Sequence, residues 1–498
     1  MHFWDLLVIG LYGLTVIAIG AAANRKQKNT EDYYLGGRGL PWWAVGISIL
    51  ATSFSSASLI GGTGAGYASG MKMIQWQIGD LLAFSIVCVF FLPYFARLRL
   101  TTAYEFLEHR FGRAARLVAS GLFLLQTVLR TGLLVYAPAL ALSTVLGWSI
   151  ETAISLTALC AILYSSFGGI SAVIWTDLIQ VGVIGVGVVA SLFLIAGDVP
   201  GGFDTILETA RNANRMQAVD LSFDWKNPFT LGWTVLAYGV LALSIAGTNQ
   251  QAVQRYQSCR DLASSRKAAL FGWGIGALVL GATLFLGVCL HAWTTLVPDA
   301  LPDPVKGDQV LPALILHRLP PGLAGLLVAA IFAASMSSID SAIHSMSTAT
   351  LIDFVRPHLR QPLTESAELR WARVLTALFG LIALGVALVA AQQEQGLFQT
   401  MVKWLGYFAG PLLGLFLLGI VTRRASQPGA LLGVGLSFLG VIGSIVLELP
   451  AEYGFHPLWL APVALGITLL VGRGFAPLPA DRAWPGLPES RPDSDQSR

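Results

Sequence analysis

Apolar runs long enough to cross a membrane recur along almost the whole chain of 498 residues. A helix needs about 20 consecutive apolar residues to span the hydrocarbon core of a bilayer. Thirteen runs approach or exceed that length, at 3–21, 41–68, 73–96, 117–146, 151–168, 171–196, 230–250, 268–292, 321–347, 372–391, 401–421, 428–447 and 457–472. The sequence therefore predicts an all-α polytopic membrane protein with about 13 transmembrane helices.

Composition supports the same class. Only 12% of the residues are charged and 55% are hydrophobic, whereas a soluble domain carries about 25% charged residues. No basic stripe stands out, which argues against a nucleic-acid partner. The four cysteines show no metal-ligand spacing. We therefore expect the partners to be the lipid bilayer, small solutes and ions, and we expect the chain to function as a monomer.

The basic residues predict the orientation in the membrane. With the N-terminus outside, 23 of the 31 Lys and Arg residues fall in or beside inner segments and 7 fall on the outer side. Cytoplasmic loops carry this excess of positive charge. No Lys or Arg precedes the first apolar run, so it is predicted to be a true span and not a cleaved signal peptide. We expect a cytoplasmic (inner) membrane protein with its C-terminus inside.

The domain organisation is simple. Residues 1–474 are predicted to form one transmembrane transporter domain. Residues 475–498 are rich in Pro, Asp and Ser and are predicted to be a disordered cytoplasmic tail.

The second apolar run contains the sequence ATSFSSASLIGGTGAGYASG at 51–70. Ser and Gly make it a poor continuous helix, and Gly61, Gly62, Gly64 and Gly66 crowd together. Unwound backbone at membrane depth lines cavities, where its freed carbonyls coordinate cations. The alternative is close helix packing through small residues. The run predicts a broken helix at a binding site.

The ninth run carries FAASMSSIDSAIHS at 332–345. Helical spacing places Ser337, Ser338, Asp340 and Ser341 along one side. Hydroxyls, carbonyls and few charges suit a hard cation that must leave again. The alternative is a Ser-rich helix that bonds its own backbone, but a buried acid in lipid is costly and usually functional. His344 is expected to pack at an inner gate, with a proton relay left open.

Charged residues also lie inside other runs. Arg130 stands mid-span, where a charge costs at least about 3 kcal/mol. Its partner is either an internal acid such as Asp80 or an anionic substrate, whose carboxylate fits the guanidinium fork. Gln77 and Asp80 lie three apart and face the same side of the third run. Asp177 either faces the cation site or caps a helix start.

Five ordered segments together resemble the sodium/solute symporter family: YYLGGRGLPWWAVGISILATSFSSAS, TTAYEFLEHRFG, GGISAVIWTDLIQ, TNQQAVQRY and AASMSSIDS. TGLLVYAPALALSTVLG and TNQQAVQRYQSCR are most similar to the branch that transports monocarboxylates, vitamins and iodide, and Arg130 resembles an arginine of bacterial sialic-acid transporters. The resemblance implies a five-plus-five inverted repeat of LeuT-like fold, whose first helices, near 51–68 and 235–250, are broken.

The resemblance also implies site residues. A first sodium site would use the carbonyls of Ala51, Phe54 and Ala334 with the hydroxyls of Ser337 and Ser338. A second sodium site would use Asp177, Ser337, Asp340 and Ser341, although Asp340 stands where some relatives have Ser. Substrate contacts would come from Ser53, Ser55, Ser58, Gln77 and Arg130.

The function that follows is sodium-coupled symport of a small solute into the cell, with Na⁺ as the coupling ion and a carboxylate as the favoured substrate. A sugar or amino-acid symporter with Arg130 locked to Asp80 is the first alternative. A membrane sensor that binds solute without moving it is the second. An enzyme is not expected, since no nucleophile–base arrangement or metal motif is present.

Overall fold

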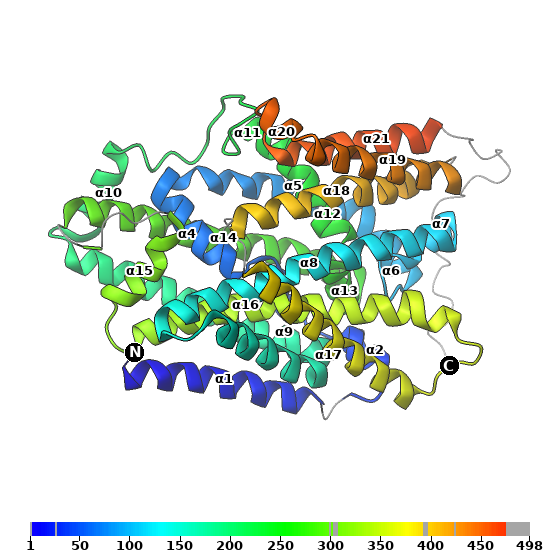
Figure 1. The fold of residues 1–498 in the computed structure, drawn as a ribbon, viewed down its shortest axis with the longest axis horizontal. Helices are drawn as coiled ribbons and strands as arrows, with labels where there is room; N and C mark the ends of the chain where they lie inside the picture. The colour runs from blue at the N-terminus through cyan, green and yellow to red at the C-terminus, as the bar shows by residue number, and fades with distance from the viewer. Residues whose placement is uncertain are drawn as a thin grey trace.

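The computed structural model describes residues 2–24, 27–297, 300–301, 307–391, 397–422 and 425–474. In these ranges the chain is helical without strands, apart from an isolated bridge between Leu40 and Cys259. The helices run roughly along the long axis, with α1 at one edge and α19 and α21 at the opposite edge (Figure 1). The predicted tail 475–498 lies outside the described residues.

Each predicted apolar run falls on helix. The first six form α1 (Phe3–Asn24), α3 (Trp42–Ser53) with α4 (Ser56–Ser69), α5 (Trp76–Ile86) with α6 (Leu92–Leu98), α8 (Arg113–Leu146) and the two halves of α9 (Ile150–Asp198). The other seven form α12 (Gly239–Thr248), α14 (Leu262–Leu296), α16 (Leu323–Ala349), α17 (Glu365–Ala390), α18 (Leu397–Val421), α19 (Gln427–Val446) and α21 (Leu460–Gly474). In the described part of the chain, ten stretches are long and apolar enough to cross a membrane, and three apolar helices are shorter.

Shorter helices connect these spans. They are α2 (Thr30–Leu35), α7 (Glu105–Phe111), α10 (Gly202–Asn212), α11 (Leu231–Trp233), α13 (Gln250–Gln257), α15 (Val310–His317) and α20 (Leu449–Glu452). The π-helical turns η3 (Val87–Phe91) and η4 (Thr234–Tyr238) lead into α6 and α12, and η6 (Thr350–Val355) continues α16.

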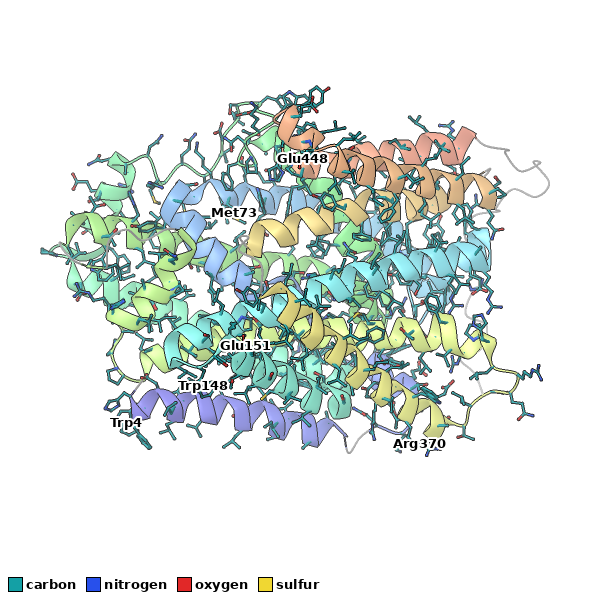
Figure 2. All side chains as sticks on the ribbon, viewed as in Figure 1. Trp4, Met73, Trp148, Glu151, Arg370 and Glu448 are labelled. Atoms are coloured by element: carbon teal, nitrogen blue, oxygen red, sulfur yellow. The ribbon has the colours of Figure 1, made fainter. Side chains whose placement is uncertain are left out.

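The outer surface is apolar and the centre is polar. Phe3, Leu14, Phe193 and Leu278 are each more than 60% exposed, and Figure 2 shows Trp4 at the rim of α1. Only lipid solvates so many exposed apolar side chains. The serines of α16 are buried instead, because α16 packs against α1, α3, α4, α8, α9 and α17. The polar part of the ninth run therefore lies at the centre of the protein.

Two helices are broken, as the resemblance implies. α3 ends at Ser53, Phe54 and Ser55 have extended backbones, and α4 begins at Ser56. α12 ends at Thr248, and the extended Asn249 separates it from α13. Both breaks turn helix ends toward the interior, where their unpaired carbonyl and N–H groups need partners.

The glycine-rich stretch itself is a regular helix, which corrects the expectation that its glycines unwind the chain. A Cβ on Gly66 would lie 2.1 Å from the Leu284 carbonyl oxygen, and one on Gly287 would lie 2.0 Å from the Thr63 carbonyl oxygen. These glycines let α4 and α14 pack backbone to backbone. The break comes just before them, where Ser55 and Ser58 form a capping box that starts α4.

Gly169 separates the fifth and sixth predicted spans inside α9. Its φ of 59° interrupts the helical geometry, and a Cβ there would lie 2.8 Å from the Tyr33 carbonyl oxygen. A residue with a side chain would be strained at this φ. The kink sets the direction of the second half of α9, which carries Asp177.

Candidate functional site

The carbonyl end of α3 meets two serine hydroxyls of α16. The Ser337 hydroxyl donates to the Ala51 carbonyl oxygen at 2.9 Å and to that of Ala334 at 3.0 Å. The Ser338 hydroxyl donates to the Thr52 carbonyl oxygen at 3.1 Å. Because α3 ends at Ser53, its last carbonyls lack intrahelical partners and form the negative end of the helix. Five uncharged, buried oxygens thus come together from two helices.

Four of the five residues predicted for the first sodium site meet here, and the fifth, Phe54, lies in the break beside them. Thr52 supplies a carbonyl that the prediction did not name; its position next to Ala51 at the expected break was the available signal. The donor set fits sodium, since alkali and alkaline-earth cations prefer oxygen ligands and few charges allow release. Ala51, Thr52, Ala334, Ser337 and Ser338 are the residues able to hold the ion.

Among the residues predicted for the second sodium site, hydrogen bonds link Asp177, Ser341 and Ser337, whereas Asp340 bonds to α9. Asp177 Oδ2 accepts the Ser48 hydroxyl at 2.5 Å and Arg255 Nη2 at 3.3 Å. The Ser341 hydroxyl oxygen accepts Arg255 Nη2 at 2.5 Å. Asp340 Oδ1 accepts the Ser165 hydroxyl at 2.7 Å. Asp177 therefore faces α3 and α13 and does not cap a helix start.

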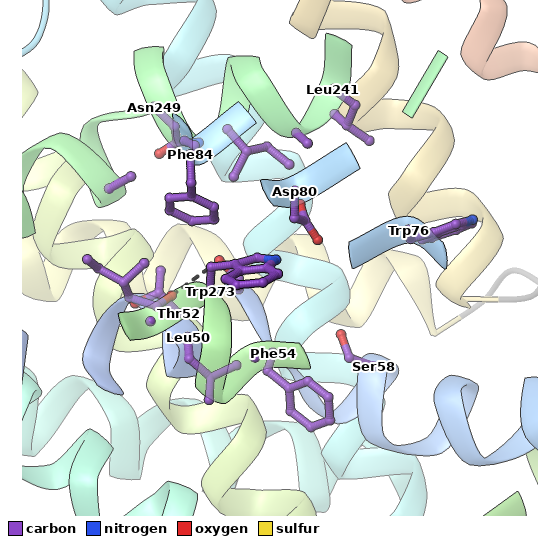
Figure 3. Close-up of a pocket in the computed structure, with 18 of the residues that line it drawn as sticks. Leu50, Thr52, Phe54, Ser58, Trp76, Asp80, Phe84, Leu241, Asn249 and Trp273 are labelled. Carbon is purple, nitrogen blue, oxygen red and sulfur yellow. Dashed lines mark hydrogen bonds between the residues drawn. The ribbon is translucent and has the colours of Figure 1, made fainter. Parts of the chain in front are cut away.

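A cavity of about 200 Å³ lies next to both breaks (Figure 3). Its wall is mainly apolar and aromatic: Phe84 and Trp273 lie together at the centre of the view (Figure 3), and Trp76 also lines the cavity. Four of the predicted substrate residues line it: Ser53, Ser58, Gln77 and Arg130. Ser55 is not among the lining residues, because its hydroxyl caps α4. An apolar pocket with few polar groups is typical of a small-molecule site.

Arg130 reaches the cavity from α8 and is 8% exposed. Its Nη1 donates to Gln251 Oε1 at 3.1 Å. In the described part of the chain, Arg130 Nε and Gln251 Nε2 have no hydrogen-bond partner, and Arg130 has no ion pair. Buried polar groups are normally paired. Two linked donors beside the cavity therefore lack an acceptor.

Asp80 is not the partner of Arg130. It accepts Gln77 Nε2 at 3.1 Å and the Tyr238 hydroxyl at 3.1 Å. His344 is buried and is not among the residues that line the cavity; Gln254 Nε2 lies 3.1 Å from its Nδ1, and its ring lies 4.9 Å from that of Tyr33.

Several site residues were missed from the sequence. Asn249, Gln251 and Arg255 all line the cavity, and all come from the quoted segment TNQQAVQRY. Four polar residues in a row, 248–251, at the end of a predicted span were a signal for a polar site that the sequence interpretation did not use. Ser48 gave no signal, since a single Ser in an apolar run is common.

Known proteins are similar to this chain along most of its length. Residues 33–436 match the sodium:solute symporter family. The chain is 32% identical to human sodium-coupled monocarboxylate transporter 2, over 90% of this chain and 74% of that one. It is also 32% identical to the sodium/sialic acid symporter NanT of Aliivibrio fischeri, over 88% of each chain.

Solved structures show the same fold. A Na⁺-coupled sialic acid symporter in a substrate-bound, outward-open state superposes with a TM-score of 0.87 at 27% identity, over 96% of this chain and 99% of that one. A nucleobase-cation symporter, Mhp1, has the same fold with a TM-score of 0.58 at 14% identity, over 88% and 92% of the two chains.

Proposed function

Because this chain belongs to the sodium:solute symporter family and is a sodium-coupled membrane transporter, we propose that it imports a small carboxylate by alternating access. The observation that carries this proposal is the pair of unpartnered donors, Arg130 Nε and Gln251 Nε2, at the cavity. A carboxylate supplies the acceptors that both donors lack. Relatives named for monocarboxylates, sialic acid and iodide all carry anions.

The surroundings of Arg130 favour an anion further. The planar guanidinium binds a carboxylate with two parallel hydrogen bonds. Phe54 and Ser58 at the start of α4, and Asn249 and Gln251 at the start of α13, line the same cavity. Helix N-termini in broken helices carry positive partial charge and point at anionic substrate groups in transporters. The apolar wall would hold the body of the solute.

We propose that the first cluster, Ala51, Thr52, Ala334, Ser337 and Ser338, holds the sodium ion. A bound ion supplies the positive charge that links the end of α3 to α16. Movement of one charge through 100 mV provides about 2.3 kcal/mol, and a tenfold gradient adds about 1.4 kcal/mol. The protein would work as a monomer in the cytoplasmic membrane, with its N-terminus outside and its C-terminus inside.

The experiment is uptake of labelled lactate, pyruvate, acetate and sialic acid into proteoliposomes, with and without Na⁺. Arg130→Ala should lower anion uptake about 100-fold, because two charge-assisted hydrogen bonds of about 1.5 kcal/mol each are lost. Arg130→Lys, which keeps the charge without the fork, should fall between. Sodium binding to both purified variants should be unchanged. Normal anion uptake by Arg130→Ala would reject the carboxylate assignment.

The sodium site has its own arm of the experiment. The double variant Ser337→Ala, Ser338→Ala removes both hydroxyls and should abolish the dependence of uptake on Na⁺. Ser335→Ala, on the same helix but bonded to Ser56, is the matched control. Unchanged activation by Na⁺ in the double variant would reject this cluster as the ion site.

A further inference from the structure

Asp80 is a carboxylate at the cavity that the proposed function does not use. It lies on α5, and Figure 3 shows its side chain among those that line the cavity. The Tyr238 hydroxyl lies 3.2 and 3.1 Å from its two oxygens, and Gln77 Nε2 donates to Oδ2 at 3.1 Å. A carboxylate has about four acceptor sites. These two side chains therefore leave Asp80 able to accept hydrogen bonds from a solute.

The charges around the cavity are not balanced in pairs. Among the described residues, the charged side chains that line it are Asp80, Arg130 and Arg255. Arg255 is paired with Asp177. In the same part of the chain, neither Asp80 nor Arg130 forms an ion pair, with each other or with another residue. A charge in the interior without a counter-charge is costly, so one negative and one positive group at this cavity each lack a partner.

We propose that Asp80 binds an ammonium group of the solute, so that the substrate is an amino carboxylate with its carboxylate on Arg130 and its ammonium group on Asp80. The inference rests on the proposed function, in which Arg130 binds the carboxylate. A solute of this class supplies both counter-charges at once. A simple monocarboxylate would pair with Arg130 alone and would leave the charge of Asp80 facing an alkyl chain.

The surroundings of Asp80 suit an ammonium group. Trp76, Tyr238 and Trp273 line the cavity together with it. The rings of Trp76 and Tyr238 stack with their centroids 4.6 Å apart, and Trp273 Nε1 donates to the Gln77 carbonyl oxygen at 3.0 Å, one helical turn from Asp80. Aromatic faces attract ammonium groups, and the carboxylate among them adds the counter-charge. Aromatic rings alone would hold an alkyl chain, so the acid is the group that would discriminate.

A structural role accounts for the hydrogen bonds of Asp80 but not for its charge. The bond with Tyr238 connects α5 to η4, the turn that leads into α12. Asparagine can accept from the same hydroxyl without the cost of placing a charge in the interior. The negative charge therefore needs another explanation, and a cationic group on the solute provides one.

The test compares solutes that differ in one terminal group. Glycine, β-alanine, 4-aminobutyrate and 5-aminovalerate carry an ammonium group where propionate, butyrate, valerate and hexanoate carry a methyl group. Sodium-driven uptake into proteoliposomes gives the half-saturating concentration of each. At one chain length or more, wild type should prefer the ammonium solute at least about 10-fold, because a site that pairs with a polar group rejects the analogue that lacks it. Equal or stronger uptake of the methyl solute at all four lengths would overturn the inference.

Asp80→Asn removes the charge and keeps an acceptor for Tyr238. It should reduce the preference for the ammonium solute to about twofold or less, while uptake of the methyl solute stays as in wild type or improves. Asp220→Asn is the matched control, because Asp220 pairs with Lys72 and is not among the lining residues, and it should keep the wild-type preference. An unchanged preference in Asp80→Asn would contradict the role of Asp80.

Two further outcomes separate this inference from the proposed function. If Asp80→Asn does not fold, Tyr238→Phe keeps the carboxylate and removes a competing donor, so it should retain or increase the preference for the ammonium solute, and loss of that preference would overturn the inference. Uptake that favours methyl solutes but still requires Arg130 would contradict this inference and leave the proposed function intact. Failure of every solute in both series to enter the liposomes would count against both.

Discussion

Two buried arginines face the same cavity, and their hydrogen bonding differs. Every guanidinium nitrogen of Arg255 has a protein acceptor, and a carboxylate lies beside it. Arg130 has one amide acceptor from Gln251 and an unpartnered Nε. A buried charge without a partner is costly. An arginine whose donors all have protein acceptors therefore fits a structural role, and an arginine with an unpartnered donor fits a role in binding a ligand.

The difference comes from the helices around each residue. Arg255 lies on α13 where α3, α9 and α16 converge, and these supply Ser48, Asp177 and Ser341. Arg130 lies midway along α8, and its one hydrogen bond in the described part of the chain goes to the Gln251 side chain of α13. The two arginines share Gln251, whose backbone carbonyl serves Arg255. Gln251 therefore connects the arginine that would bind the solute, Arg130, to the fully hydrogen-bonded Arg255.

The largest effect is expected from Asp177→Asn. It removes the only carboxylate of Arg255 in the described structure, and breaking a buried ion pair costs about 3–5 kcal/mol. The apparent melting temperature in detergent should fall sharply, and Arg255→Gln added to Asp177→Asn should restore most of the loss. If Asp177→Asn melts like wild type, Arg255 does not depend on this carboxylate and the contrast with Arg130 is lost.

Gln251→Glu should convert Arg130 into a satisfied arginine. The new carboxylate would pair with Nη1, which Gln251 Oε1 already contacts, and would compete with the solute for the fork. The half-saturating concentration for anion uptake should rise about 10–100-fold, a loss of about 1.4–2.7 kcal/mol, while sodium binding stays the same. The new ion pair in Gln251→Glu should also raise the melting temperature. Gln251→Leu is the control, because it removes the amide without adding a charge and should weaken uptake without that rise. Unaltered solute affinity in Gln251→Glu would separate Arg130 from the substrate.

Arg130→Gln should change stability in the direction opposite to that of Asp177→Asn. Removal of an unpaired buried charge relieves desolvation, so the protein should gain about 1 kcal/mol or remain as stable as wild type. The measurement is the melting temperature of Arg130→Gln without solute, compared with that of wild type. A large loss of stability would mean that Arg130 has a structural partner like that of Arg255.

The sequence predicted the fold and the first cluster more fully than the rest. Apolar length fixes spans independently of neighbours, and helical spacing placed Ser337 and Ser338 on one face, as the structure has them. The break was expected within 51–70 and falls there, at Phe54–Ser55; the glycines that follow it pack closely against α14, as the alternative interpretation had it. The resemblance grouped Asp177 with Asp340; in the structure Asp177 accepts Ser48 of α3 and Arg255 of α13, and Asp340 accepts Ser165 of α9. Side-chain pairing across distant helices is not encoded in local periodicity.

The smallest effect is expected from Thr52→Val, which touches the surroundings of Arg255 but not those of Arg130. The Thr52 hydroxyl lies 3.0 Å from the Ser341 hydroxyl and donates to the Ser48 carbonyl oxygen at 2.8 Å, while its own carbonyl belongs to the first cluster. Valine keeps that carbonyl and the shape, so stability should fall by about 1 kcal/mol and sodium affinity should change less than about twofold, because no ligand oxygen is lost. Thr52→Ser, which keeps the hydroxyl, should behave like wild type in both measurements. If Thr52→Val weakens ²²Na⁺ binding tenfold, the hydroxyl is itself a ligand, and the cluster around Arg255 and the sodium site are one unit instead of two.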